Sequence, residues 1–137
     1  MDNIAIVLTI FDGYSDMWDD CINRINKYWN NHPPVYVFTN EIVKDWGEGV
    51  YCYSVGKDAE WSKKAKMATE IVKEDFIVLL LEDFFIGKKI DIQEVEKLID
   101  FMKKNKIVYA KLCDNNRVLY KHKRKYNKNY PYEVIYA

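Results

Sequence analysis

One stretch of the sequence decides the expected fold: Phe76-Ile77-Val78-Leu79-Leu80-Leu81-Glu82-Asp83-Phe84-Phe85. Its first six residues form an unbroken apolar run, which is typical of a β-strand that is buried on both faces. Such a strand belongs inside a sheet that has helices on each side. We therefore predict that residues 76–81 form the central strand and that the two carboxylates lie just beyond its end.

Four further apolar runs predict strands at residues 4–11, 35–38, 50–55 and 107–112. Apolar residues at helical spacing predict helices that begin near Ser15, near Asp58 or Ser62, and at Asp91. Strands and helices thus alternate along most of the chain. This order predicts an α/β fold, a three-layer sandwich with a mostly parallel central sheet and helices on both faces.

Length and composition favour one folded domain. The chain has 137 residues, of which 49% are hydrophobic and 31% are charged. We expect a single domain over residues 1–137, with a basic and less regular C-terminal segment at 116–137 that carries six basic residues and one acidic residue. The formal net charge is zero, which argues against a nucleic-acid partner.

Cysteines and apolar runs bear on the expected location. Cys21, Cys52 and Cys113 lie inside apolar patterns without metal-ligand spacing, so we interpret them as small core residues of a protein in a reducing, cytoplasmic compartment. No apolar run approaches the length of a membrane span, so any membrane association is expected to be peripheral.

Polar side chains follow several predicted strands at the point where each strand ends. The carboxyl ends of parallel strands share one edge of a sheet, where open α/β sheets bind ligands. Acids predominate there, which suits a divalent cation such as magnesium or manganese. Adjacent side chains on an extended strand point to opposite faces, so Glu82 and Asp83 serve one ligand only if the chain turns between them. The alternative is that this pair only ends the strand.

Missing motifs exclude several classes of enzyme. The sequence has no GxGxxG after its first strand and no GxxxxGK[ST], which disfavours dinucleotide-binding folds and P-loop NTPases. It also lacks a GxSxG motif. Its two histidines, His32 and His122, lie in polar segments, so a histidine-based hydrolase is not expected.

Three parts of the chain together resemble a known family. These parts are the strand at residues 4–11, the run Asp58-Ala59-Glu60-Trp61-Ser62 that opens a helix, and the strand that ends in Glu82-Asp83-Phe84-Phe85. They resemble bacterial glycosyltransferase-like proteins of the GT-A fold, of the kind that build capsule and lipopolysaccharide. The resemblance covers roughly residues 4–115 by the order of elements.

The resemblance implies a nucleotide-sugar donor, a divalent metal (manganese or magnesium) and a glycan or lipid-linked acceptor. Asp83 and Glu82 would hold the metal, with Asp83 the better candidate. Other readings remain for several residues: Trp61 could belong to the core face of its helix, and Ser62 could cap that helix. Asp12 could be a simple turn residue, and Lys57 and Asp58 could lie in a solvated loop. The candidate donor-binding residues are Thr9, Asp12, Lys57, Asp58, Trp61, Ser62, Glu82 and Asp83.

The chain departs from the family pattern in two ways. The usual acidic motif is Asp-x-Asp, whereas no second acid stands two positions after Asp83. The family also uses a further C-terminal portion for the acceptor site and the catalytic base, and Asp114 is the candidate base here. A non-catalytic or degenerate nucleotide-sugar-binding domain is therefore one alternative. A phosphoacceptor signalling domain is another, although it would require an acidic pair where this chain has Asp12 alone.

Overall fold

The computed structural model describes residues 3–112 and 134–136. The chain divides into two compact units, Met1–Ile90 and Asp91–Ala137, and each is described by itself.

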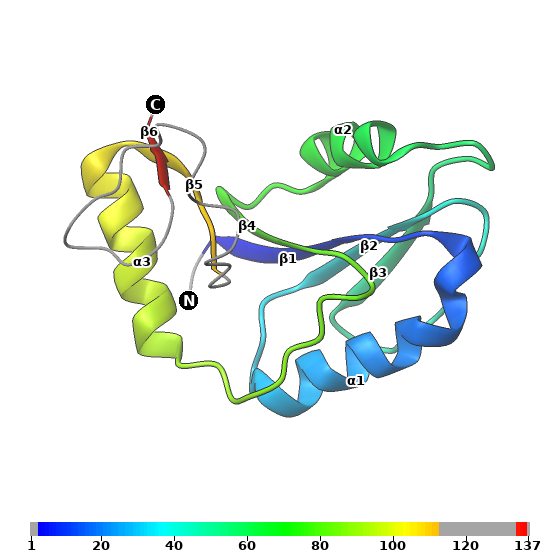
Figure 1. The fold of residues 1–137 in the computed structure, drawn as a ribbon, viewed down its shortest axis with the longest axis horizontal. Coiled ribbons are helices and arrows are strands. Elements are labelled where there is room, and N and C mark those ends of the chain that lie inside the picture. Colours follow the sequence, from blue (N-terminus) through cyan, green and yellow to red (C-terminus); the bar gives the residue numbers. More distant parts are fainter. Residues whose placement is uncertain (1–2, 113–133, 137) are drawn as a thin grey trace, which may run out of the picture. The chain divides into compact units, whose positions relative to one another are not determined.

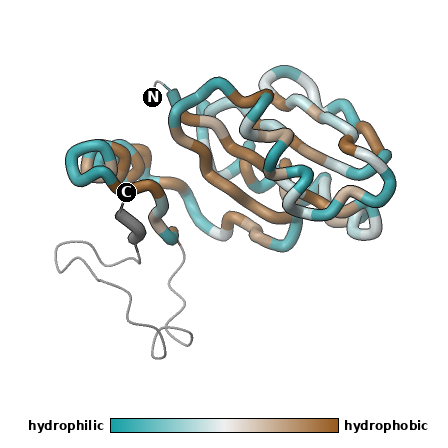
Figure 2. Tube along the Cα trace, turned by 90° about the horizontal axis from the view of Figure 1, so that it is seen from above, coloured by the Kyte–Doolittle hydropathy of each residue, from teal (hydrophilic) through white to brown (hydrophobic). Residues whose placement is uncertain are grey.

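The first unit is built on a four-stranded sheet. Its strands are β1 (Ile4–Thr9), β2 (Val35–Thr39), β3 (Val50–Ser54) and β4 (Phe76–Leu80). They are parallel and lie in the order β3-β2-β1-β4 (Figure 1). The strands carry the hydrophobic residues, whereas the connecting loops are largely hydrophilic (Figure 2). The predicted α/β class with a parallel sheet is confirmed.

Helices cover both faces of this sheet. A 3-10 helix, η1 (Asp12–Met17), leads into α1 (Trp18–Tyr28), so the helix begins later than the predicted start at Ser15. The second helix, α2 (Trp61–Ile71), lies on the opposite side of the sheet from α1 (Figure 1). Alternate residues of a strand point to opposite faces. Accordingly, Leu8 packs with Trp18 of α1, whereas Val7 packs with Ala68 of α2.

The interior strand of the described sheet is β1 and not β4, so the prediction of a central strand at residues 76–81 is wrong. Every residue of β1 is buried. In contrast, β4 pairs only with β1 in this sheet, and Ile77 and Leu79 are 46% and 41% exposed. The register pairs Leu79 with Val7, which places both on the face that α2 covers. Since α2 packs on β1 and β2, it leaves this side of β4 exposed.

This difference between β1 and β4 is testable with two isoleucines. We expect Ile6→Val to lower the free energy of unfolding by ~0.5–1.5 kcal/mol, because Ile6 is fully buried and loses one methylene from a packed site. The matched change Ile77→Val on β4 should stay within about 0.5 kcal/mol of the parent protein, because the side chain is half exposed. Urea unfolding measures both. An equal loss at both positions would place β4 in the core after all.

The second unit contains α3 (Ile92–Asn105), β5 (Ile107–Ala110) and β6 (Val134–Tyr136). The Asp91 side chain accepts hydrogen bonds from the backbone N–H groups of Gln93 and Glu94, which confirms the predicted start of this helix. Hydrophilic and hydrophobic residues alternate along α3 (Figure 2). Residues 107–110 form a strand as predicted, but β5 pairs antiparallel with β6 and not with the parallel sheet of the first unit. Most of the basic segment at 116–137 lies outside the described residues.

The two described cysteines fit the role of core residues. Cys21 is buried in α1, and burial is the main cause that raises the pKa of its thiol to about 11. Cys52 is half-buried in β3, and burial raises its pKa as well. Among the described helices, none has both the length and the apolar character that a membrane span requires.

Candidate functional site

The carboxyl edge of the sheet has its switch point between β1 and β4. From β1 the chain continues to β2 on one side, while β4 lies on the other side. Open α/β sheets bind ligands in the crevice that such a reversal creates. At this point the backbone N–H of Phe11 donates to Oε1 of Glu82 over 3.4 Å, so the segments that follow β1 and β4 are adjacent.

Asp12 holds the segment after β2 in place. Its carboxylate accepts the backbone N–H groups of Asn40, Glu41 and Ile42 over 2.9, 2.8 and 3.0 Å. Burial alone would raise the pKa of Asp12, but these three donors and the nearby Lys64 ammonium together lower it below the usual value. The carboxylate is thus engaged by the protein itself, and a ligand would have to share it.

The side chain of Asn40 joins three segments at the same edge. Asn40 is 4% exposed, and its Nδ2 donates to the backbone carbonyl oxygens of Gly56, Lys57 and Ala59 over 3.2, 3.2 and 3.0 Å. Its Oδ1 accepts a hydrogen bond from Nζ of Lys64 over 2.8 Å. The loop before α2, the end of β2 and α2 itself are therefore fixed to one another.

Lys64 is the site residue that sequence reasoning missed. It is 4% exposed, and its Nζ donates to the backbone oxygen of Ile10 over 2.6 Å as well as to Asn40. Burial lowers the pKa of its ammonium group, while the charges of Asp12 and Glu82 oppose that effect. One signal in the sequence points to it, because Lys64 stands four residues before Ala68 and therefore shares a helix face with that buried residue.

The chain turns at Glu82 and Asp83, which is the condition for the two carboxylates to serve one ligand. Leu81 to Phe84 form a turn closed by a 3.0 Å hydrogen bond from the N–H of Phe84 to the oxygen of Leu81. Glu82 is 8% exposed and points inward, whereas Asp83 is exposed. The adjacent carboxylates therefore differ: one is buried beside Phe11 and the other faces solvent.

The remaining predicted residues are distributed around this edge. Thr9 is 3% exposed at the end of β1, and its hydroxyl has no hydrogen-bond partner within the described chain. Lys57 and Asp58 have exposed side chains in the turn that Asn40 holds. Asp114, the candidate base, lies outside the described residues.

Trp61 and Ser62 are the first two residues of α2. Neither has the structural role, core residue or helix cap, that the sequence also allowed. Trp61 is 54% exposed, so it does not belong to the core. The N-cap of α2 is Glu60, and Ser62 is the second helical residue, so Ser62 does not cap the helix. Both side chains are exposed at the end of α2 that follows the carboxyl edge of β3, where a ligand could contact them.

Exposed aromatic rings surround the switch point. Phe11, Tyr14 and Phe84 are 52%, 54% and 50% exposed, although large aromatic side chains are ordinarily mostly buried. The Phe11 and Tyr14 rings are in edge-to-face contact, with centroids 5.7 Å apart. Such rings offer flat apolar surfaces beside the carboxylates, which is a combination suited to a sugar ring or a nucleobase.

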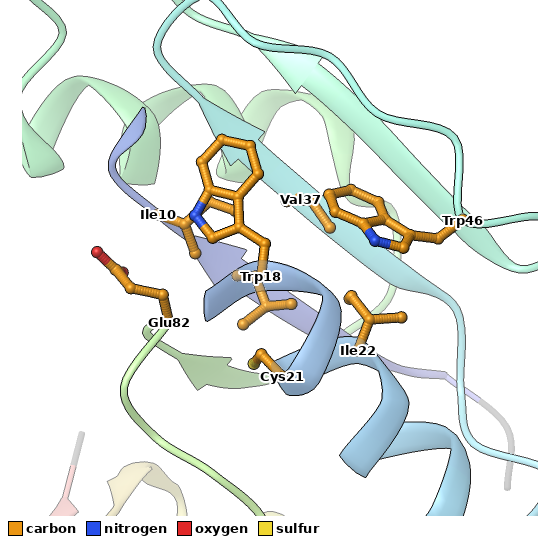
Figure 3. Close-up of a pocket in the computed structure, with 8 residues that line it drawn as sticks. Ile10, Trp18, Cys21, Ile22, Val37, Trp46 and Glu82 are labelled. Atoms are coloured by element: carbon orange, nitrogen blue, oxygen red, sulfur yellow. The ribbon is translucent and has the colours of Figure 1, made fainter. Parts of the chain in front are cut away.

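The pocket beside Glu82 is a gap in the packing between α1 and the sheet. Ile10, Trp18 and Trp46 are among the side chains that line it (Figure 3). The gap has no room for even a water molecule, whereas typical ligand pockets enclose ~300–1,000 Å³. A nucleotide-sized ligand would therefore lie across the open edge, not inside this pocket. In the part of the chain that the structure describes, no three His, Cys, Asp or Glu side chains are grouped as ligands for a metal.

Comparison with protein-family models finds no match for this chain, and comparison with curated proteins finds none either.

Proposed function

We propose that this chain binds a nucleotide-sugar donor across the switch point of its sheet and acts as a glycosyltransferase-like enzyme on a glycan or lipid-linked acceptor. The observation that carries the proposal is the contact between the segments that follow β1 and β4, where Glu82 accepts the backbone N–H of Phe11. The Phe11 ring and the neighbouring Asp83 carboxylate are both exposed there. Carboxylates can accept hydrogen bonds from sugar hydroxyl groups, and an exposed ring can stack on a flat ligand. The resemblance to GT-A glycosyltransferases supports the same reading.

A divalent metal fits this site in one arrangement. Magnesium in phosphate-binding sites is held by one or two carboxylates together with phosphate oxygens and water. Asp83 is the solvent-facing carboxylate that could supply such a ligand, while Glu82 is turned inward beside Phe11. The metal would neutralise charge on the leaving diphosphate when bound. The residues of the protein would position the donor and the acceptor.

Replacing Asp83 by asparagine tests this proposal. The change keeps the size of an exposed side chain and removes its charge, so we expect the fold to survive. Metal-dependent binding of a nucleotide-sugar should weaken by ~10- to 100-fold. Calorimetric titration of a panel of nucleotide-sugars, with and without manganese, identifies the donor and measures the loss.

Asp75→Asn is the matched control, because Asp75 is exposed at the opposite end of β4. It should leave donor binding unchanged. If no nucleotide-sugar binds the parent protein, or if the two variants behave alike, the donor site is not at Asp83. Hydrolysis or transfer of the bound donor would separate an enzyme from a non-catalytic binding domain.

A further inference from the structure

The ammonium group of Lys64 is a buried cation with no direct ionic partner within residues 3–112 and 134–136. No ion pair of Lys64 occurs among the described residues, where its hydrogen bonds go to two neutral oxygens, those of Ile10 and the Asn40 side chain. A lysine ammonium has three N–H donors, so these bonds leave one donor over. Burying a charge is costly unless it is paired. The two hydrogen bonds tie α2 to the sheet, but a neutral side chain could do the same. The burial of a charged group at this position therefore needs a further explanation.

Lys64 lies close to the switch point, because its Nζ donates to the backbone oxygen of Ile10 directly after β1. Its Nζ lies over the half-exposed Phe11 ring, 6.0 Å from the ring centroid, which is a cation–π contact. A Cβ atom at Gly13 would collide with the Phe11 ring, so glycine lets the ring lie against the backbone there. An exposed aromatic side chain changes rotamer rapidly, so the Phe11 ring can leave its contact with Nζ.

The nearby carboxylates do not neutralise Lys64 by contact. Both oxygens of Asp12 are engaged by the three backbone N–H groups of residues 40–42, and Glu82 accepts the N–H of Phe11. Their charges favour the protonated form of Lys64 from a distance. Burial lowers the pKa of Lys64, and these two charges oppose that effect. In its ammonium form, the side chain has one N–H donor to offer.

We propose that Lys64 is the protein's own cation for the diphosphate group of a ligand bound where β1 and β4 end. The inference rests on the proposed function, because the diphosphate would be that of the nucleotide-sugar. It assigns to Lys64 a charge-pairing role beside any metal at Asp83. A phosphate oxygen would take the free N–H donor once the Phe11 ring has moved aside.

Chemical shifts of the lysine Cε and Hε nuclei of the intact protein test this inference without any substitution. The signals are assigned through the side chain from the backbone. Inorganic pyrophosphate is titrated with and without Mg²⁺, and uridine, UDP and other nucleoside diphosphates are titrated in parallel. We expect pyrophosphate or the diphosphates to shift the Lys64 signals, whereas uridine and the exposed neighbour Lys63 should show no comparable change.

Two adjacent variants give the affinity. Lys64→Gln should weaken pyrophosphate or nucleoside diphosphate binding by ~10- to 100-fold, the loss of one hydrogen bond to a charged group. Lys63→Gln, one residue away on the exposed face of α2, should leave it unchanged. If Lys64→Gln does not fold, the shifts in the unaltered protein still decide.

The outcomes separate this inference from the proposed function. Nucleoside diphosphates that shift signals of Phe11 and Asp83 but not those of Lys64 would overturn the inference and leave the donor site standing. Pyrophosphate that shifts Lys64, in a protein that binds no nucleotide-sugar, would keep the anion site and overturn the proposed donor. The absence of any shift with every probe would overturn both.

Discussion

Trp18→Ala is expected to lower the free energy of unfolding by ~3–5 kcal/mol, the largest effect of any single change considered for this protein. Trp18 opens α1, is 1% exposed and packs against Leu8 and Val37 of the sheet. The centroid of its ring lies 6.3 Å from that of the Trp46 ring, and Trp46 belongs to the loop between β2 and β3. Removing the indole would leave a cavity between α1, the sheet and this loop.

The matched control is Trp61→Ala, because Trp61 opens α2 as Trp18 opens α1 but is 54% exposed. Its loss should change the free energy of unfolding by about 0.5 kcal/mol or less. Urea unfolding followed by circular dichroism measures both variants without relying on tryptophan fluorescence. Comparable losses in the two variants would contradict the assignment of Trp18 to the core and Trp61 to the surface.

Trp18→Phe refines this test. The indole N–H of Trp18 is buried and has no hydrogen-bond partner within the described chain. Phenylalanine keeps most of the apolar volume and removes this unsatisfied donor, so it should cost much less than alanine. A loss as large as that of Trp18→Ala would indicate that the N–H is in fact bonded.

Asp12→Ala should lower the free energy of unfolding by ~2–4 kcal/mol, because it removes the acceptor of three backbone hydrogen bonds at once. Of the three donors, that of Asn40 belongs to a buried residue and would be left without a partner, whereas Glu41 and Ile42 are exposed and can bind water. The loop after β2 should therefore open locally. Asp16→Ala, at an exposed position in the same 3-10 helix, is the control and should cost little.

The effect of Asp12 should depend on pH in a defined direction. The pKa of Asp12 is lowered in the folded protein from an ordinary value near 3.8. Its stabilising contribution is therefore fully present above the unfolded pKa and is lost as the pH falls through the folded pKa. The gap between the parent protein and Asp12→Ala should be widest near neutral pH and should shrink below about pH 4. A gap that stays constant down to acidic pH would show that the charge of Asp12 is not involved.

The sequence by itself determined the element types and the edge at which polar groups meet. Short unbroken apolar runs form their backbone hydrogen bonds and bury their side chains as strands inside a layered fold. All five of the predicted runs form strands. Asp12 and Glu82 are far apart in the chain, yet both follow strands that run in the same direction. Parallel pairing alone brings such residues to one edge, which is why their closeness could be predicted from the order of the elements.

Which strand lies inside the sheet was decided only by tertiary structure. The runs at residues 4–11 and 76–81 look alike in composition, and both are compatible with burial on two faces. Their burial differs because β1 pairs with a strand on each side and is covered by a helix on each face. In the described sheet, β4 pairs with one strand. Long-range pairing of this kind leaves no mark on local composition.

The orientation of neighbouring side chains was decided in the same way. Lys63 and Lys64 are identical residues side by side, but successive residues of a helix point about 100° apart. The packing of α2 on β1 and β2 places Lys64 at the sheet edge and leaves Lys63 facing solvent. Likewise, the turn after β4 determines that Glu82 is buried and Asp83 exposed. The sequence alone shows that charged residues stand in these segments. The packing of the helices and strands determines which of those side chains are buried.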